Sequence, residues 1–372
     1  MNILIIGGNR FVGKLIAKKL IPTHNITIIN RKGTGPEGCT ILKGDRNNTL
    51  EFINKLSNFK FDIVIDMCLY NPEQCLIIDK LFLGKISKYI FMSSIASKMD
   101  GFGEYGVNKK KCEEFLKSSS IPYIILQPTY IIGKGDHSDR IKYYVDRILD
   151  GGKISIDGKG DGLINFIDSE DVCDVVCTLV SSSHHHKTKN ITYELSCDNN
   201  SSLNDLVWNL SQFSHKNILP KTEHNSPKDS PYTNKKCFAN NSKVKEHLDF
   251  QFINFQDTLK KVFYEYKSSC TSALEIAIRS LGIVNQKILV TTNTWMSCAN
   301  VILMTNNTPV FVDINADTLN MDTNDILKKL DGAKAILWVH MAGLINPDFF
   351  KIKKICDTKG IKIIEDCAHA HG

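Results

Sequence analysis

The stretch MNILIIGGNRFVG, Met1 to Gly13, decides how the rest of the chain is interpreted. Asn2 to Ile6 is a short, apolar, β-branched run, typical of a strand buried on both faces. Gly7 and Gly8 interrupt it, and apolar residues at helical spacing resume from Phe11 to Leu20. Strand, glycine turn and helix begin a dinucleotide-binding fold, because the N–H groups and dipole of a helix N-terminus favour a pyrophosphate.

Position 10 departs from the glycine pattern of such turns. The spacing G-x-x-G-x-x-G has its second glycine there, and this chain has Arg10 between Gly7 and Gly13. We therefore expect a dinucleotide turn whose contact with the pyrophosphate is altered.

The end of the next predicted strand, Asn25 to Ile29, bears on the choice between NAD and NADP. An acidic residue there accepts from the ribose 2′-hydroxyl, whereas an arginine accommodates a 2′-phosphate. Here the residues are Asn30 and Arg31, and Arg10 approaches from the glycine turn. Two cations without a carboxylate favour NADP; the alternative is that both arginines are solvated. Asp45 is placed to contact the adenine amine, although a turn residue needs no such role.

Composition sets the broad class. The chain has 372 residues, 42% of them hydrophobic, which is enough for two or more domains. Neither a signal peptide nor a membrane-spanning apolar run is evident, so we expect a cytoplasmic protein without a membrane partner. Most of the twelve cysteines lie in apolar runs, which favours buried thiols; we predict no metal site. The net charge of +6 is scattered and indicates no particular partner.

Strands alternate with helices along the first 130 residues. Further strands are predicted at 40–43, 62–66, 88–92 and 121–127, with a helix at 72–81. Alternation of this kind predicts βαβ units, hence a Rossmann-type, doubly wound parallel sheet.

The predicted chemistry lies after the strand at 88–92, where ligands bind in open α/β sheets. Ser94 follows that strand, and Tyr105 and Lys109 share one face of a helix expected at 108–116. A lysine ammonium and an oxidised nicotinamide would together lower the phenol pKa. The tyrosine then takes a proton from a sugar hydroxyl while the serine bonds the same oxygen. The alternative is a surface tyrosine and lysine.

Residues 1–267 resemble the NAD-dependent epimerase/dehydratase family of extended short-chain dehydrogenases/reductases. The motifs that carry the resemblance are Gly7 to Gly13, Ser94, Tyr105-x-x-x-Lys109, Gln127-Pro128-Thr129 and Asn165 to Asp168. The glycine turn, Asn30-Arg31 and Gly44 to Arg46 are most similar to an atypical branch that includes stem-loop RNA-binding proteins. The resemblance implies that Gly7, Gly8, Arg10, Phe11, Gly13, Asn30, Arg31 and Asp45 bind NADP or NAD, and that Ser94, Tyr105 and Lys109 are catalytic.

Two further departures from the family pattern reduce the number of activities that the sequence favours. Only eleven positions separate Ser94 from Tyr105, so a substrate-facing loop is shortened. Ile95-Ala96 replace the Asp-Glu pair with which 4,6-dehydratases expel water. An epimerase or reductase of a nucleotide-linked sugar is therefore favoured over a dehydratase.

Beyond 130 the pattern is less regular and resembles a small substrate-binding subdomain. We predict a helix at 140–149, a hairpin at 151–162, a strand at 191–195, an exposed loop at 216–241 and a helix at 255–266. Arg140 and Arg147 are candidate diphosphate contacts, with solvation equally favoured. His184 to His186 are expected in a solvated loop.

Residues 268–372 form a second α/β pattern that resembles the DegT/DnrJ/EryC1/StrS family of sugar aminotransferases, which use pyridoxal phosphate (PLP). The motifs are Cys270 to Leu274, Asn293 to Trp295, Pro309 to Asp313, Val339 to Gly343 and Glu365 to Gly372. We predict helices at 271–281 and 348–357 and strands at 287–291, 309–313, 335–340 and 362–364. The resemblance implies that Thr271 and Ser272 hold the cofactor phosphate, Trp295 stacks on the ring, Asp366 binds the ring nitrogen and His369 approaches the ring oxygen.

This second segment is expected to be a partial unit of fold-type I aminotransferase. The family's Schiff-base lysine belongs to a segment downstream of Glu365-Asp366, and no residue here is assigned to it. We therefore expect a vestigial PLP site without transaminase activity, and exposed apolar faces that need a homodimer or a partner chain.

The sequence thus predicts an epimerase/dehydratase-like domain at 1–267 followed by a truncated aminotransferase-like domain at 268–372. The predicted function is an NAD(P)-dependent oxidoreductase or epimerase of a nucleotide-sugar. The alternatives are an RNA-binding protein of the atypical branch and a degenerate fusion remnant without activity.

Overall fold

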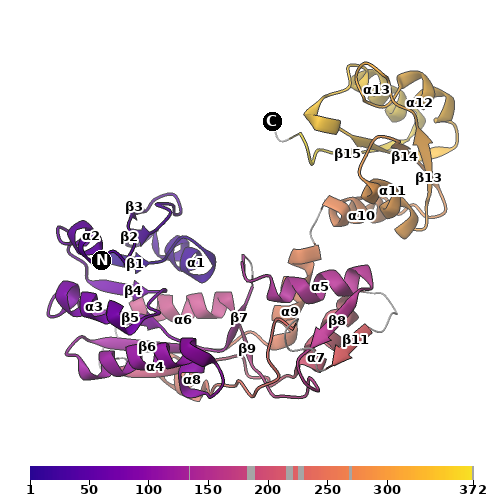
Figure 1. Ribbon diagram of the computed structural model, residues 1–372. Helices are drawn as coiled ribbons and strands as arrows, with labels where there is room; N and C mark the ends of the chain where they lie inside the picture. Colours follow the sequence, from indigo (N-terminus) through magenta and orange to yellow (C-terminus); the bar gives the residue numbers. More distant parts are fainter. Residues whose placement is uncertain (134, 182–188, 215–220, 225–229, 268–269, 371–372) are drawn as a thin grey trace. The chain divides into compact units, whose positions relative to one another are not determined.

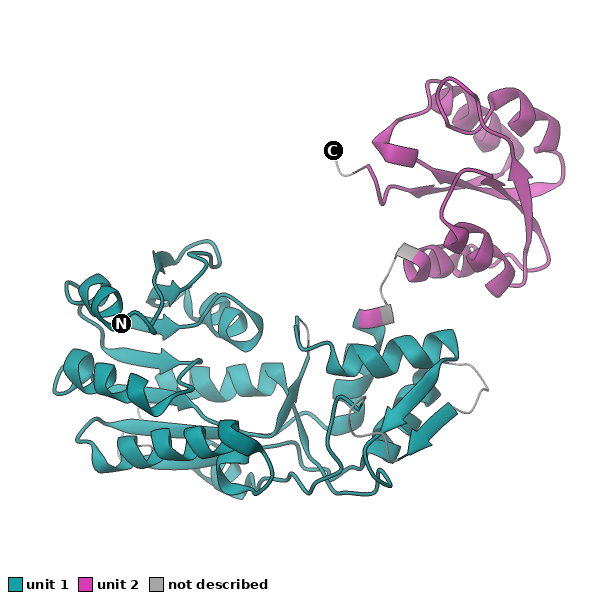
Figure 2. Cartoon of the chain, in the orientation of Figure 1, with its two compact units in different colours: residues 1–265 teal, residues 266–372 magenta. Residues whose placement is uncertain are grey.

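The chain divides into two compact units, Met1–Glu265 and Tyr266–Gly372 (Figure 2). The structure is a computed structural model, and it describes all residues except 134, 182–188, 215–220, 225–229, 268–269 and 371–372. The predicted loop at His184 to His186 lies outside the described residues.

Unit 1 is built on a seven-stranded sheet in which every neighbouring pair is parallel. The strands lie in the order β10-β6-β5-β4-β1-β2-β3. Their bounds are β1 Asn2–Ile6, β2 Asn25–Asn30, β3 Thr40–Lys43, β4 Ile63–Asp66, β5 Lys88–Met92, β6 Tyr123–Pro128 and β10 Ile191–Leu195. The predicted doubly wound sheet is confirmed. The strand order reverses between β1 and β4, and this switch point is where open α/β sheets bind ligands.

Helices cover both faces of this sheet (Figure 1). Their bounds are α1 Phe11–Leu20, α2 Thr49–Leu56, α3 Cys75–Phe82, α4 Gly103–Ser118, α6 Ser169–Ser181 and α8 Ser242–Leu248. Alternate residues of β1 serve the two cores: Ile3 and Ile5 pack with α1, α6 and α8, whereas Leu4 and Ile6 pack with α2, α3 and α4. Continuously apolar strands are what burial on both faces requires.

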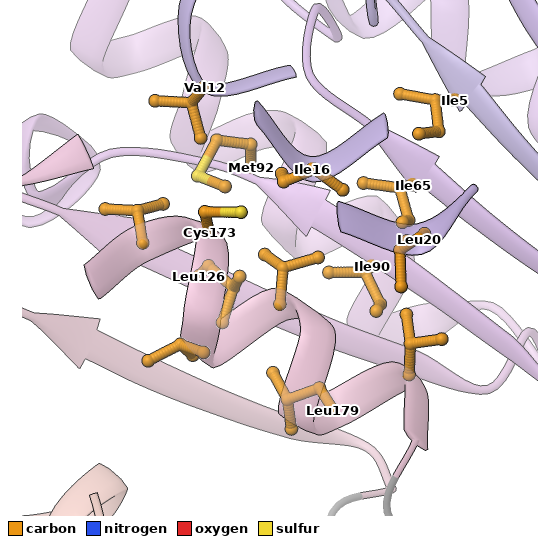
Figure 3. Packing of buried hydrophobic residues seen from close by; sticks show 14 of the residues in the cluster. Ile5, Val12, Ile16, Leu20, Ile65, Ile90, Met92, Leu126, Cys173 and Leu179 are labelled. Atoms are coloured by element: carbon orange, nitrogen blue, oxygen red, sulfur yellow. The ribbon is translucent and has the colours of Figure 1, made fainter. Parts of the chain in front are cut away.

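The first of these cores is a cluster of buried hydrophobic side chains between the sheet and its helices (Figure 3). Ile16 and Leu20 of α1 and Leu179 of α6 lie against the sheet, where Ile90 and Leu126 come from neighbouring strands. This packing fixes α1, and with it the glycine turn that precedes α1.

The rest of unit 1 forms a smaller subdomain around two short parallel pairs. The elements are β7 Tyr130–Ile132, α5 Arg140–Asp150, β8 Lys153–Ile156, β9 Phe166–Asp168, α7 Leu203–Phe213, β11 Lys221–His224 and α9 Phe255–Lys267. The hairpin predicted at 151–162 is wrong, because β8 pairs in parallel with β11 and not with a strand next to it in sequence.

The exposed loop predicted at 216–241 is also wrong in part. Tyr232 and Cys237 are each 2% exposed, and the Tyr232 ring stacks against Tyr144 of α5. Because the residues around them are polar, the sequence did not predict that Tyr232 and Cys237 are buried in the subdomain core.

Unit 2 has a four-stranded parallel sheet of order β13-β12-β14-β15. Its elements are α10 Cys270–Ser280, β12 Lys287–Thr291, α11 Met296–Met304, β13 Thr308–Val312, α12 Thr323–Lys329, β14 Ala333–Val339, α13 Phe349–Lys359 and β15 Lys362–Asp366. Separate apolar clusters pack on the two sheet faces. The sheet fits a partial aminotransferase-like unit, as predicted.

The sequence analysis missed two helices of this unit, α11 and α12. The Asp322 side chain accepts from the Asp325 N–H at 2.8 Å and so caps the start of α12. That Asp-x-x-Asp spacing is a helix-start signal that was available in the sequence.

The eleven cysteines whose side chains the structure describes are free thiols, in line with the predicted preference for buried thiols. None of the described helices has both the length and the apolar character needed to cross a membrane.

We expect Leu126→Ala to lower the free energy of unfolding of unit 1 by about 2–5 kcal/mol, because it leaves a cavity in a fully buried core. Leu126 is 0% exposed, whereas Leu76 on α3 is 72% exposed. The matched control Leu76→Ala should change the free energy of unfolding by less than about 0.5 kcal/mol. Urea denaturation measures both, and equal losses would contradict the assigned core.

Candidate functional site

A cavity of about 1530 Å³ opens at the carboxyl ends of the central strands of unit 1. Ten of the eleven residues predicted to bind NADP or NAD or to be catalytic line it: Gly7, Arg10, Phe11, Gly13, Asn30, Arg31, Asp45, Ser94, Tyr105 and Lys109. The cavity therefore brings the glycine turn and the Ser/Tyr/Lys set together. Gly8 does not line the cavity.

The three glycines of the turn have different physical roles. Gly7 has φ +89°, in the region that favours glycine. A Cβ on Gly13 would lie 2.8 Å from the Gly7 carbonyl oxygen, so only glycine lets α1 approach the turn this closely. A Cβ on Gly8 would lie 2.8 Å from a methyl carbon of Ile5, so Gly8 serves packing.

The arginine at position 10 fits the backbone without strain. Arg10 has φ −140° and ψ 156°, an extended conformation open to any residue, and its side chain is exposed. Phe11 has φ +42° instead, which is unusual for a large side chain. Its ring makes an edge contact with His137, at 6.4 Å between ring centroids. Backbone strain thus falls on Phe11.

At the end of β2, Asn30 and Arg31 have separate roles. The Asn30 side-chain oxygen accepts from the N–H groups of Lys32 and Gly33 at 3.0 Å, and its amide donates to the Thr34 carbonyl at 2.7 Å. Asn30 therefore shapes the loop, while Arg31 stays exposed at the cavity.

The turn after β3 is shaped in a similar way. The Asp45 carboxylate accepts from the Asn47 N–H at 3.0 Å. Asp45 remains partly accessible from the cavity.

Ser94 and Tyr105 face each other across the start of α4. The Ser94 hydroxyl accepts from the Ala96 N–H at 3.2 Å, and Ser94 also forms a side-chain hydrogen bond with Tyr105. Helix α4 begins at Gly103, five residues before the predicted start, so Tyr105 lies in its first turn. This turn places the phenol beside the serine.

Burial raises the pKa of Tyr105, and the Ser94 hydrogen bond and the Arg140 charge oppose that rise. The sequence analysis predicted a lowered pKa with Lys109 and a bound nicotinamide. In the protein alone the direction is the reverse, because desolvation of the phenol outweighs the neighbouring groups.

Lys109 is 1% exposed, and its ammonium donates to the Met92 carbonyl at 2.8 Å. Burial lowers the pKa of this lysine to about 8. The ammonium lies 4.6 Å from the centroid of the Tyr70 ring and 4.8 Å from that of Phe91. Tyr70 lines the cavity and was not identified from the sequence.

A second residue missed from the sequence, Glu113, organises the serine segment from behind. Its carboxylate accepts from the hydroxyls of Ser93 and Ser97 at 2.6 and 2.7 Å and from the Gln127 amide at 2.8 Å. Glu113 lies one turn beyond Lys109 on α4 and is 3% exposed. It ties β5, the serine segment, α4 and β6 together.

A buried ion pair lies beneath the same cavity. The Arg46 guanidinium contacts both Asp66 oxygens, at 2.9 and 2.8 Å, and the Tyr89 hydroxyl also donates to Asp66. Arg46 is 7% exposed and Asp66 is 0% exposed. The ion pair could have been predicted from the carboxylate of Asp66 at the end of the buried strand β4, because a buried charge needs a partner of opposite charge.

In unit 2, the residues implied for PLP lie at strand and helix ends. Asp366 ends β15, is 6% exposed, and accepts from the Ala368 N–H at 3.0 Å and the Cys298 thiol at 3.5 Å. His369 accepts from the Ala342 N–H at 3.4 Å. Trp295, just before α11, is 80% exposed.

Thr271 and Ser272 both lie in the first turn of α10, and Ser272 is 8% exposed. A hydroxyl pair in a helix's first turn fits a phosphate-binding role. A buried carboxylate at Asp366 likewise fits a ring-nitrogen partner.

His340, Glu365 and Cys367 also gather at this edge, each with one ligand-type atom within 4.8 Å of the others. The prediction that the chain has no metal site stays a prediction.

Family comparisons match the two units differently. Residues 103–193 match the NAD dependent epimerase/dehydratase family, and residues 252–372 match the DegT/DnrJ/EryC1/StrS aminotransferase family. Both resemblances seen in the sequence are thereby confirmed.

Two curated proteins are similar to the C-terminal part of this chain. The L-glutamine:2-deoxy-scyllo-inosose aminotransferase of Streptomyces kanamyceticus is 36% identical over 107 residues, which are 28% of this chain and 25% of that protein. The GDP-perosamine synthase of Vibrio cholerae is 31% identical over 129 residues, 34% of this chain and 35% of that protein. The chain thus spans about a quarter to a third of the length of these relatives.

Solved structures share the fold of unit 1. The UDP-glucose 4-epimerase of Thermotoga maritima, solved with UDP-glucose, has a TM-score of 0.61 at 16% identity and covers 72% of this chain and 99% of its own. The dTDP-glucose 4,6-dehydratase of Bacillus anthracis, solved with NAD, has a TM-score of 0.61 at 16% identity and covers 72% and 97%. At such identity the likeness confirms the predicted fold class alone.

We expect Arg46→Met to lower the free energy of unfolding of unit 1 by about 3–5 kcal/mol, because it leaves the buried Asp66 carboxylate without its cation. The exposed control Arg31→Met should cost less than about 0.5 kcal/mol. Urea denaturation near pH 7 compares the two variants. A loss no larger for Arg46→Met than for Arg31→Met would show that the ion pair is dispensable.

Proposed function

We propose that unit 1 is an oxidoreductase or epimerase that binds NADP or NAD in this cavity and acts on a nucleotide-linked sugar. The observation that carries the proposal is the shared cavity: the Ser94, Tyr105 and Lys109 side chains line the same space as the glycine turn. That is the arrangement in which a substrate hydroxyl and a nicotinamide meet.

The glycine turn supports a dinucleotide in this cavity. The left-handed Gly7 and the close approach of Gly13 bring the start of α1 against the turn, so backbone N–H groups there can face a pyrophosphate. Bound NADP or NAD would supply the acceptor for the hydride that leaves the sugar carbon.

A preference for NADP over NAD rests on the end of β2. Arg10 and Arg31 are exposed cations on the cavity wall. The Asn30 side chain is committed to its own loop and is not an acid. A ribose 2′-phosphate therefore meets positive charge where an NAD-specific site has a carboxylate.

The chain's own residues account for proton movement. The Tyr105 oxygen takes the proton of the sugar hydroxyl, and the Ser94 hydroxyl, already bonded to Tyr105, holds the same sugar oxygen. The positive charge of Arg140 favours the tyrosinate form, in which Tyr105 can accept that proton and become a neutral phenol.

The substrate class follows from the relatives. The structural neighbours include epimerases solved with UDP-glucose and UDP-glucuronic acid. Arg140 extends along the cavity wall and lies 5.6 and 5.3 Å from the ring centroids of Tyr130 and Tyr232. A cation held on aromatic faces in this position suits an anionic nucleotide-sugar.

We expect Tyr105→Phe to lower kcat for a nucleotide-sugar by about 10²- to 10⁴-fold, because it removes the acid/base hydroxyl. Turnover of UDP-, GDP- and dTDP-linked sugars is followed by cofactor absorbance and sugar analysis, with Tyr264→Phe on α9 as the matched control. Dinucleotide affinity should stay unchanged. Wild-type turnover that survives Tyr105→Phe would refute the mechanism, and a wild-type chain inert toward every such sugar would refute the function.

For unit 2 we propose a narrower role, a PLP-type pocket that does not transaminate in the 372-residue chain by itself. Asp366 offers the carboxylate and Thr271 and Ser272 the phosphate end, in line with the family match. Bound PLP would supply the electron sink for amino transfer. No residue of the given sequence is assigned to the Schiff-base lysine.

We therefore expect no amino transfer to a keto-sugar when the 372-residue chain is mixed with PLP and an amino-acid donor. Mass spectrometry of the sugar product measures the transfer. An aminated sugar, lost in Asp366→Ala, would show that unit 2 is an active transaminase.

A further inference from the structure

The ammonium of Lys109 is enclosed by aromatic rings. Its nitrogen lies 4.6 Å from the centroid of Tyr70, 4.8 Å from Phe91 and 5.9 Å from Tyr105. Among the described residues, its one hydrogen bond is the donation to the Met92 carbonyl. Lys109 is therefore a buried cation with ring faces as close neighbours.

Such an enclosure has a direct effect on the charge of the lysine. Removal from water disfavours an ammonium, and burial lowers the pKa of Lys109 to about 8. The negative face of an aromatic ring attracts a cation and so favours the protonated form. The rings thus oppose the loss of the proton near neutral pH.

The three rings are not equivalent. Phe91 is 0% exposed and belongs to the core, and Tyr105 is the proposed acid/base. Tyr70 is 48% exposed, lines the cavity and lies outside the motifs seen in the sequence. Its backbone N–H donates to the Gln74 side chain at 3.2 Å, which fixes the segment after β4. Its ring lies 6.4 Å from that of Tyr105.

We propose that Tyr70 is a positioning residue whose ring face holds Lys109 protonated and beside Tyr105 at the cavity wall. The importance of this role for catalysis rests on the proposed function. The effect of Tyr70 on the protonation of Lys109 can be tested without it. Tyr70 acts through its face and not through a phenolate charge, because desolvation of the phenol end, despite the exposure of the rest of the side chain, raises its own pKa to about 12.

Other charged and titratable groups also face Lys109. Asp66 favours the ammonium but is paired with Arg46, which opposes it. Cys68 and Cys112 also interact with Lys109 and favour its ammonium form. These groups are the same in every Tyr70 variant, so a change of the ring isolates the contribution of Tyr70.

The test is the pH at which the Lys109 amine becomes reactive. The full chain is labelled with trace acetic anhydride across pH 6–10, and mass spectrometry of the Lys109 peptide gives the midpoint. We expect Tyr70→Phe to keep the wild-type midpoint and Tyr70→Leu to lower it by roughly half a unit to one and a half units. Tyr70→Trp, with the stronger ring face, should raise it.

Tyr264→Leu controls for loss of a half-exposed tyrosine elsewhere and should leave the midpoint unchanged. A midpoint that stays fixed or rises in Tyr70→Leu, or moves equally in Tyr70→Phe, would overturn the proposal. If Tyr70→Leu does not fold, a Tyr70→Trp midpoint at or below the wild-type value overturns it. Failure of the chain to bind NADP or NAD would refute the proposed function and leave this result standing.

Discussion

The close approach of α1 to the first turn is the constraint on which unit 1 depends. A Cβ on Gly13 would lie 2.8 Å from the Gly7 carbonyl oxygen, so the contact exists only with glycine at position 13. Ile16 and Leu20 then reach the sheet, and the helix N-terminus faces the point where strand order reverses. The cavity lies at that point because parallel strands present their carboxyl ends together.

Local patterns predicted most of the fold but not the long-range contacts. Strands such as β1 and β5 are continuous apolar runs, and their positions followed from the sequence. The pairing of β8 with β11 joins segments about seventy residues apart, and no local signal carries it. Tyr232 was hidden for the same reason, because its burial comes from Tyr144 and Phe166 and not from its polar neighbours.

The residues of the candidate site divide in the same way, into those that local motifs predicted and those that depend on long-range contacts. Motif spacing named ten of the residues around the cavity, since a turn and one helix face are local features. It missed Tyr70 and Glu113, which matter through contacts with Lys109 and Ser93 from other elements. It included Arg46 in a motif but did not predict the ion pair with Asp66. Gly8 shows the converse: it belongs to the motif, but its role is to make room for Ile5.

The central claim is that the cavity is a dinucleotide site with a preference for the 2′-phosphate. Titration of the full chain with NADPH and with NADH, followed by cofactor fluorescence, tests it most directly. We expect tighter binding of NADPH than of NADH, and a loss of that preference in Arg31→Ala. A chain that changes the fluorescence of neither dinucleotide would contradict it.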